Sequence, residues 1–307
     1  MSTPYVTPTE LNNMPLGIAW TTLPNPRSVD STEVMADICW RATAEVDGIV
    51  NQMLRASVNG EELQGPNFRL TVSENGNGIF TTSFWPIIDV INGEVKDASS
   101  FSASWQTVGA ANVRQYEKIS TAYAAVPPNI GGTGLNLIEI APSYVSWLAG
   151  RKGTLVRVWY VNGWPHAGIT QAATAGETQL VVDDVTGWLG YTGMTADGSA
   201  NESFTVVGVA AASPVTLSTG DVVQVGPGTL TLQSPLINAH AVGISASTLP
   251  WDVKWATGLF AAAEALTRGA TAIAAQQMHG VAQQGTGGAE AFRKIAKEIL
   301  APYRAII

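Results

Sequence analysis

Few residues of this sequence have the types and spacing that chemistry requires. The three histidines, His166, His240 and His279, are scattered, and no two of them have the short spacing of a zinc-binding pair. Cys39 is the single cysteine, so a closed zinc site built from cysteines and an intrachain disulfide are both excluded. We expect the histidines to be structural or superficial. Cys39 lies on the apolar side of a helical pattern, and we expect it to be a buried thiol.

The adjacent carboxylates Asp183 and Asp184 would suit acid–base chemistry or a calcium site. They follow a strand-like run, Gln179 to Val182, and neighbouring side chains of a strand point to opposite faces of the sheet. One site cannot readily contain both. The pair is therefore better interpreted as a solvated turn that follows a strand.

Two further patterns suggest ligand binding only weakly. Residues 131–134 (Gly-Gly-Thr-Gly) lack the lysine and the helix start of a phosphate-binding loop, and they favour a linker. Trp159, Trp164 and Trp188 leave open a sugar-binding platform, although tryptophans in a small β domain more often fill the core. The sequence predicts no catalytic residue, no metal site and no cofactor.

Helical patterns occur at the two ends of the chain. A capping box at Thr7–Glu10 predicts a short helix, and a second box at Asp30–Glu33 predicts a helix that runs to about Leu54. Near the other end, Pro250 begins a pattern of apolar residues at helical spacing that continues to Gly280. The many alanines of this third helix predict close packing against a neighbour.

Strand patterns occupy the middle of the chain. Residues 68–105 contain short strands, with Asn92-Gly93 predicted as a hairpin turn because both positions tolerate positive φ. Residues 155–247 contain six strand-like runs separated by Gly, Asp, Asn and Pro, and Asn162-Gly163 predicts a further hairpin there. Such closely spaced short strands are typical of a small sandwich or barrel.

The order of these patterns predicts an α+β fold with an inserted domain. Residues 1–150 and 248–307 would form a helical core that includes a β-hairpin, and residues 151–247 would form a small all-β sandwich or barrel inserted into it. Both helical flanks would then belong to one domain. The chain is long enough to bury a substantial core, since it has 307 residues, of which 46% are hydrophobic.

The charge distribution excludes a dedicated nucleic-acid binder. The formal net charge is −8 at pH 7, whereas such a binder needs a basic face. No Lys or Arg lies between Arg157 and Lys254, although seven carboxylates do. No run approaches about eighteen apolar residues, and the first ten residues lack the features of an export signal. We therefore expect synthesis in a cytoplasm and no membrane partner.

The C-terminal sequence AEAFRKIAKEILAPYRAII, residues 289–307, is an amphipathic helix followed by a proline and two isoleucines. Disordered tails avoid isoleucine, so we expect this segment to dock on a partner. The predicted docking residues are Phe292, Arg293, Lys294, Ile295, Lys297, Ile299, Tyr303, Arg304, Ile306 and Ile307. Burying the apolar ones would yield roughly 10 kcal/mol, which the ordering of the tail largely offsets, so firm binding needs a ring of tails. The alternative is that the tail folds back on its own helical core.

Scattered positions along nearly the whole chain carry a family resemblance. They are Leu11, Gly17, Trp20, Ile38-Cys39, Asn51–Arg55, Val182–Trp188, Ala239–Gly243, Thr248–Pro250 and Leu300–Arg304. In their order they resemble head-to-tail adaptor (connector) proteins of long-tailed bacteriophages, with the β module of the larger members. The resemblance implies a helical adaptor core and a structural role without catalysis.

The same resemblance implies the partners. Copies of the chain would form a ring, usually of twelve, beneath the portal protein, and the C-terminal segment would contact the portal. The ring would sit in the virion neck above a stopper or tail terminator, and double-stranded DNA would pass through it without sequence-specific binding. The alternatives are another neck or tail structural protein (terminator, stopper or tube) and, in a different class, a carbohydrate-binding β module.

Overall fold

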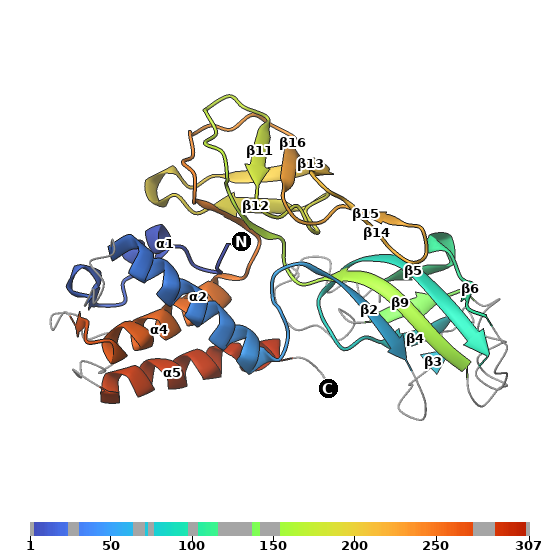
Figure 1. Ribbon diagram of the computed structural model, residues 1–307, viewed down its shortest axis with the longest axis horizontal. Coiled ribbons are helices and arrows are strands. Elements are labelled where there is room, and N and C mark those ends of the chain that lie inside the picture. The colour runs from blue at the N-terminus through green and yellow to red at the C-terminus, as the bar shows by residue number, and fades with distance from the viewer. Residues whose placement is uncertain are drawn as a thin grey trace, which may run out of the picture.

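Three structural units lie beside one another in this protein (Figure 1). The computed structural model describes residues 3–23, 31–63, 71–72, 77–97, 104–115, 137–141, 154–272 and 286–304. A helical bundle and a β-sandwich occupy the two ends of the long axis, and a β-barrel lies above the junction between them. The bundle contains helices from both ends of the chain, so it forms only when the two ends meet.

The bundle is centred on a helix that has almost no polar face. Its elements are α1 (Pro8–Asn13), β1 (Ile18–Ala19), η1 (Trp20–Thr22), α2 (Ser31–Val50), α4 (Trp251–Thr267), β18 (Thr271–Ala272), α5 (Thr286–Leu300) and η5 (Ala301–Tyr303). Helix α4 packs against both α2 and α5 and shares one hydrophobic core with them. Because 12 of its 17 residues are buried, α4 has the pattern of a central helix.

Small residues allow the neighbours of α4 to approach closely, as the alanine content predicted. Ala261, Ala262 and Ala263 are fully buried. A Cβ atom added at Gly258 would lie 2.6 Å from the sulfur of Met14, which is closer than packed atoms can be. The Met14 side chain therefore occupies the space that a side chain at position 258 would fill.

The first helix begins as the sequence predicts, whereas Asp30 of the second predicted capping box lies outside the described residues. The Thr7 hydroxyl accepts a hydrogen bond from the Glu10 N–H (3.3 Å), and the Glu10 carboxylate accepts one from the Thr7 N–H (2.8 Å), which confirms the capping box. Helix α2 ends at Val50, four residues before the predicted Leu54. Asn51 stops it by adopting a left-handed φ of 57°.

The prediction that the third helix continues to Gly280 is wrong. Helix α4 ends at Thr267, and Gly269 follows with a φ of 95°. The Ala270 N–H then donates to the Ala265 carbonyl (2.9 Å), which closes the end of the helix. Apolar residues at helical spacing continue past this point, but a glycine in the left-handed region ends the helix regardless of the side chains after it.

The β-sandwich is made of two four-stranded sheets that share one core. In the first sheet the strand order is β2 (Ser57–Leu63), β9 (Thr154–Asn162), β5 (Ile87–Asp97) and β6 (Gln106–Thr107). In the second it is β3 (Thr71–Val72), β4 (Gly78–Thr81), β8 (Leu137–Ile140) and β7 (Val113–Gln115), with η3 (Ala110–Asn112) before β7. Alternate residues of β9, among them Val156, Val158 and Tyr160, face Phe80 and Ile138 of the other sheet.

Two predicted hairpins are absent from the places where the sequence suggested them. Asn92 and Gly93 lie inside β5, which runs through them beside β9 with a register shift between Val90 and Asn92. The Asn92 side chain instead accepts from the Gly93 N–H (2.7 Å) and donates to Asp221 (2.5 Å). Gly163 does have a left-handed φ of 96°, but the strands on its two sides pair with other strands.

The barrel is a contiguous segment with its own core. Its sheet order is β10 (His166–Gly168), β17 (Ser245–Ser247), β12 (Thr192–Thr195), β13 (Ser203–Ala211), β16 (Gly228–Leu232) and β11 (Gln179–Val182), with η4 (Gly198–Ala200) and the hairpin β14 (Val215–Thr216)–β15 (Val222–Val223) as excursions. A bridge between Ile169 and Val182 joins the two edge strands. This contact closes the sheet around Leu180, Trp188 and Leu230.

The predicted fold class, a helical adaptor core with one inserted β domain, is wrong. Strand residues make up 35% of the structure and helical residues 29%, and the segment assigned to the core between the end helices is a β-sandwich. Strand β9 lies in the segment predicted as the insertion, yet it pairs with β2 and β5 from the predicted core. Strand pairing is decided by hydrogen bonds between distant segments, which local sequence patterns do not record.

Candidate partner-docking surface

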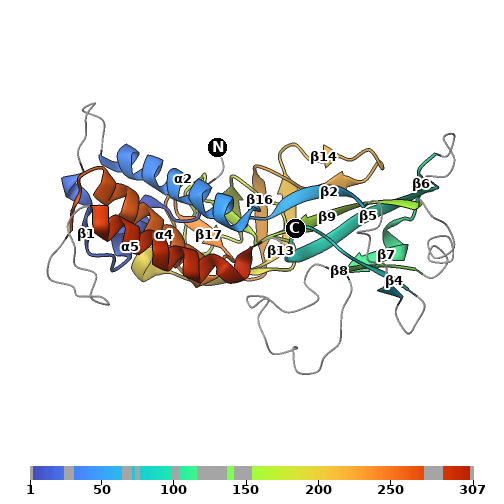
Figure 2. The same ribbon diagram turned by 90° about the horizontal axis from the view of Figure 1, so that it is seen from below.

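Helix α5, the predicted docking helix, has one face inside the bundle and one face open. Ala296 and Leu300 are fully buried, and Phe292, Ile295 and Ile299 pack, partly buried, against the core of the same chain. Figure 2 shows α5 on the outside of the bundle, in front of α4. The apolar docking candidates of the helix therefore contact their own chain, which is the fold-back arrangement that the sequence left as an alternative.

Tyr303 anchors the chain immediately after α5. Its ring is 4% exposed, stacks on Trp85 (6.1 Å between ring centroids, planes 7° apart) and meets the edge of Trp164 at 5.7 Å. Its hydroxyl donates to the carboxylate of Asp252 at 2.7 Å. Burial, together with the hydrogen bond and the charge of Asp252, raises the pKa of the Tyr303 hydroxyl, so this hydroxyl remains a donor at neutral pH.

Backbone hydrogen bonds hold the same turn. The Gln52 side-chain amide donates to the Tyr303 carbonyl (3.0 Å), and the Trp85 indole donates to the Arg304 carbonyl (3.3 Å). Gln52 also accepts from the backbone N–H of Trp85 (3.2 Å). These contacts hold the turn at Tyr303 and Arg304 in place, at the junction between the bundle and the sandwich (Figure 1).

Sequence reasoning identified only part of this anchor. It singled out Tyr303 but not Gln52, Trp85 or Asp252, which come from three distant segments and have no motif in common. The closing isoleucines of the docking prediction, residues 306 and 307, lie outside the described residues.

The open face of α5 lines a hollow with a volume of 510 Å³. Its lining residues are Glu290, Arg293, Lys294, Lys297, Glu298, Ala301 and Arg304. The structure thus brings the four cations of the docking prediction together in one place. Four cations against two carboxylates give this surface a positive balance in a chain whose net charge is −8.

The four cations differ in whether they form ion pairs within the described part of the chain. Arg293 lies 3.5 Å from a carboxylate oxygen of Glu45 and 3.8 Å from one of Glu264, so it helps to hold α5 to the bundle. Among the residues that the structure describes, no ion pair involves Lys294, Lys297 or Arg304. These three side chains are free to meet an acidic partner.

Hydrogen bonds within the chain hold His166, His240 and the aspartate pair. His166 is buried between the Ser247 hydroxyl and the Pro4 carbonyl, each 2.9 Å away, and burial together with the charge of Lys254 lowers its pKa to about 3. His240 lies between Asp197 (3.1 Å) and Glu202 (2.7 Å). His279 lies outside the described residues.

Asp183 and Asp184 each close a separate turn. Asp183 accepts from the Gly168 N–H (2.7 Å) and from the Thr3 hydroxyl (2.8 Å). Asp184 accepts from the Thr186 N–H (2.9 Å) and the Gly226 N–H (3.3 Å). In the described part of the chain no group of three or more His, Cys, Asp or Glu side chains could hold a metal ion.

The tryptophans considered as a sugar-binding platform are inside the molecule. Trp188 is fully buried in the barrel, Trp164 is 3% exposed beside Tyr303, and Trp159 is 9% exposed. A sugar ring needs an open aromatic face for stacking, and none of these three residues presents one.

Comparison of the chain with protein-family models, with curated proteins and with solved structures gives no match. Among the helices that the structure describes, none is long and apolar enough to span a membrane.

Proposed function

We propose that this chain is a structural protein of a bacteriophage neck, a head-to-tail adaptor that assembles as a ring between the portal and the next neck protein. It acts by joining proteins mechanically and catalyses no reaction. The observation that carries the proposal is the bundle, in which α1 and α2 pack with α4 and α5 from the far end of the chain. An adaptor is expected to have paired helices from both ends of its chain, whereas the other proteins of the neck and tail are expected to be shorter and mostly β.

The anchored turn at Tyr303 supports a docking role for the residues that follow it. The bonds from Gln52 and Trp85 hold the backbone of Tyr303 and Arg304 in place. Because this turn is already ordered, a partner that binds at it loses less binding free energy in ordering the chain. In this proposal the isoleucines at 306 and 307 enter a groove of the portal, the assembled ring surrounds passing DNA, and the particle forms in the host cytoplasm.

The test is co-sedimentation of the purified chain with portal rings of the phage that encodes it. Ile306→Ser combined with Ile307→Ser should weaken binding by about a hundred-fold per site, since two buried isoleucines contribute roughly 3 kcal/mol. The matched control, Leu at both positions, should bind within a few-fold of the unchanged chain. Portal binding that is unaffected by the serine pair would contradict this docking role.

A second candidate is another neck or tail protein, namely a terminator, stopper or tube subunit. The excess of strand over helix favours it, because such proteins are mostly β. The same experiment separates the two functions when tail tubes are included as a second target. Co-sedimentation with the tube and not with the portal would establish the second candidate.

A further inference from the structure

Opposite charges lie on opposite sides of this molecule. The barrel, residues 166–247, has six carboxylates and no Lys or Arg. Three cations of α5 and Arg304, which follows η5, lie around one hollow. In Figure 1 the loop before β11 lies at the upper edge of the molecule and α5 at the lower edge, and Figure 2, seen from below, places α5 nearest the viewer.

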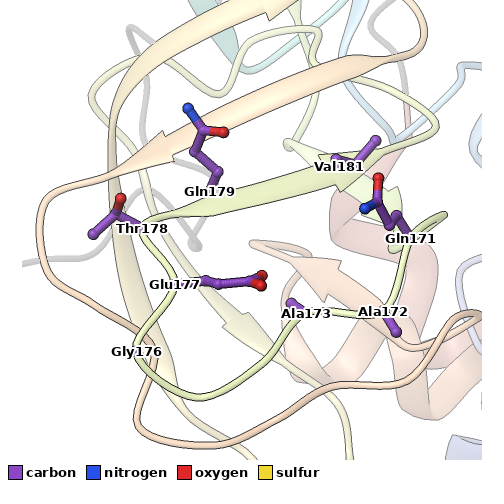
Figure 3. Close-up of a pocket in the computed structure, with 8 residues that line it drawn as sticks. All are labelled: Gln171, Ala172, Ala173, Gly176, Glu177, Thr178, Gln179 and Val181. Atoms are coloured by element: carbon purple, nitrogen blue, oxygen red, sulfur yellow. The ribbon is translucent and has the colours of Figure 1, made fainter.

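The upper edge has a hollow of its own, with a volume of 460 Å³ (Figure 3). It is lined by the segment from Gln171 to Val181, and its one charged group is Glu177, whose carboxylate extends toward Ala173. Glu177 is exposed, and its oxygen accepts a hydrogen bond from the Thr174 hydroxyl (2.8 Å). Gln171 and Gln179 add amide oxygens that can accept further hydrogen bonds.

We propose that the basic face of α5 in one copy docks against the Glu177 hollow of a second copy. The hollow offers a carboxylate and amide acceptors, and Lys294, Lys297 and Arg304 are long cationic donors with no ion pair among the described residues. Barrel and α5 also repel copies of themselves, so like-to-like pairing is disfavoured.

This pairing is head-to-tail, because the two surfaces differ and lie on opposite sides of one chain. Heterologous contacts of this kind produce closed rings when the rotation between neighbours closes, and open filaments when it does not. The inference rests on the proposed assembly role, and it assigns the two predicted docking surfaces of the C-terminal segment to different partners. It assigns the cations of α5 to the neighbouring copy and leaves residues 305–307 for the portal.

Cross-linking between copies tests the proposal without a portal. The single native thiol, Cys39, is fully buried, so cysteines introduced at exposed positions react alone. One preparation carries Ala301→Cys beside the basic hollow, the other carries Thr178→Cys beside Glu177, and a bis-maleimide joins them after mixing. The matched control replaces Thr178→Cys with Ser218→Cys, at an exposed position of the β14–β15 turn.

The mixture should give several-fold more cross-linked pairs than the Ser218 control at low salt. The excess should vanish at about 0.5 M salt, where charges are screened over a few ångströms. Lys294→Glu with Lys297→Glu in the first preparation should abolish the excess, and Glu177→Lys in the second should restore it. Equal cross-linking in control and mixture, or an excess that ignores salt and charge reversal, overturns the proposal.

The outcome is independent of the portal experiment. If cross-linking fails while the portal still binds the chain, the adaptor function stands and this assignment of surfaces is wrong. If the copies cross-link as expected but no portal binds, the chain self-associates and the adaptor function is wrong.

Discussion

The buried polar partners of the bundle lie much farther apart in sequence than those of the barrel. In the bundle, Lys254 of α4 donates to Glu10 of α1 (2.6 Å), and both side chains are buried although 244 positions separate them in sequence. In the barrel, the buried His240 lies between Asp197 (3.1 Å) and Glu202 (2.7 Å), which are 43 and 38 positions away. The bundle therefore depends on contacts between the two ends of the chain, whereas the contacts of the barrel lie within one contiguous segment with its own core.

This difference predicts that the bundle and the barrel can be destabilised independently of each other. A change at the Lys254–Glu10 contact should loosen the end helices and leave the barrel folded, and a change in the barrel core should do the reverse. Chemical denaturation measures the stability of each of the four variants below, and hydrogen exchange of α4 and barrel amides shows which unit the first two variants loosen.

Lys254→Met should have the largest effect. Burial raises the pKa of Glu10, but the charge and hydrogen bond of Lys254 outweigh burial and hold this pKa below its ordinary value. Removing Lys254 leaves a buried carboxylate without its partner, at a cost of about 3–5 kcal/mol in the free energy of unfolding. Glu10→Gln added to Lys254→Met should recover much of the loss. Unchanged protection of α4 amides in the single variant would refute the end-to-end dependence.

Leu180→Ala should destabilise the barrel by about 3 kcal/mol, because Leu180 is fully buried and its truncation leaves a cavity. Its neighbour on β11, Val181, is only partly buried, so Val181→Ala serves as the control and should cost about 1 kcal/mol or less. Exchange should accelerate at barrel amides and stay slow in α4. An equal acceleration in both units would mean that they unfold together.

His166, a buried residue of β10, should make the free energy of unfolding depend on pH. Its pKa falls from 6.5 to about 3 in the folded chain, so the unfolded chain binds the extra proton. Its contribution is therefore complete above pH 6.5 and is lost as the pH falls toward 3, by up to about 1.4 kcal/mol per pH unit. His166→Gln should flatten this slope between pH 6.5 and about 5, where carboxylates titrate little. A slope that persists in the variant would assign it to another group.

Tyr303→Phe should have the smallest effect, about 1 kcal/mol, because it removes one hydrogen bond to Asp252 and keeps the ring between Trp85 and Trp164. The double change with Asp252→Asn should cost no more than the single changes together. A shift in the fluorescence of Trp85 would show instead that the hydroxyl positions the whole aromatic cluster.

Local features of the structure were accessible from the sequence. The capping box at Thr7, the strand Gln179–Val182 and the amphipathic character of α5 each depend on residues within one or two turns of one another. The fold class was not accessible. Strand β9 shows a plain strand pattern, but nothing in it specifies β2 and β5 as its neighbours.

The docking surface, too, could be predicted only in part from the sequence. The apolar stripe and the cationic stripe of α5 follow from the amino-acid order alone, because helical spacing fixes which side chains share a face. That the apolar stripe covers α4 of its own chain, and that Lys294, Lys297 and Arg304 line an open hollow, is known from the folded chain alone. Burial of an apolar face is not directional, so the sequence specifies a face to be covered without specifying which surface covers it.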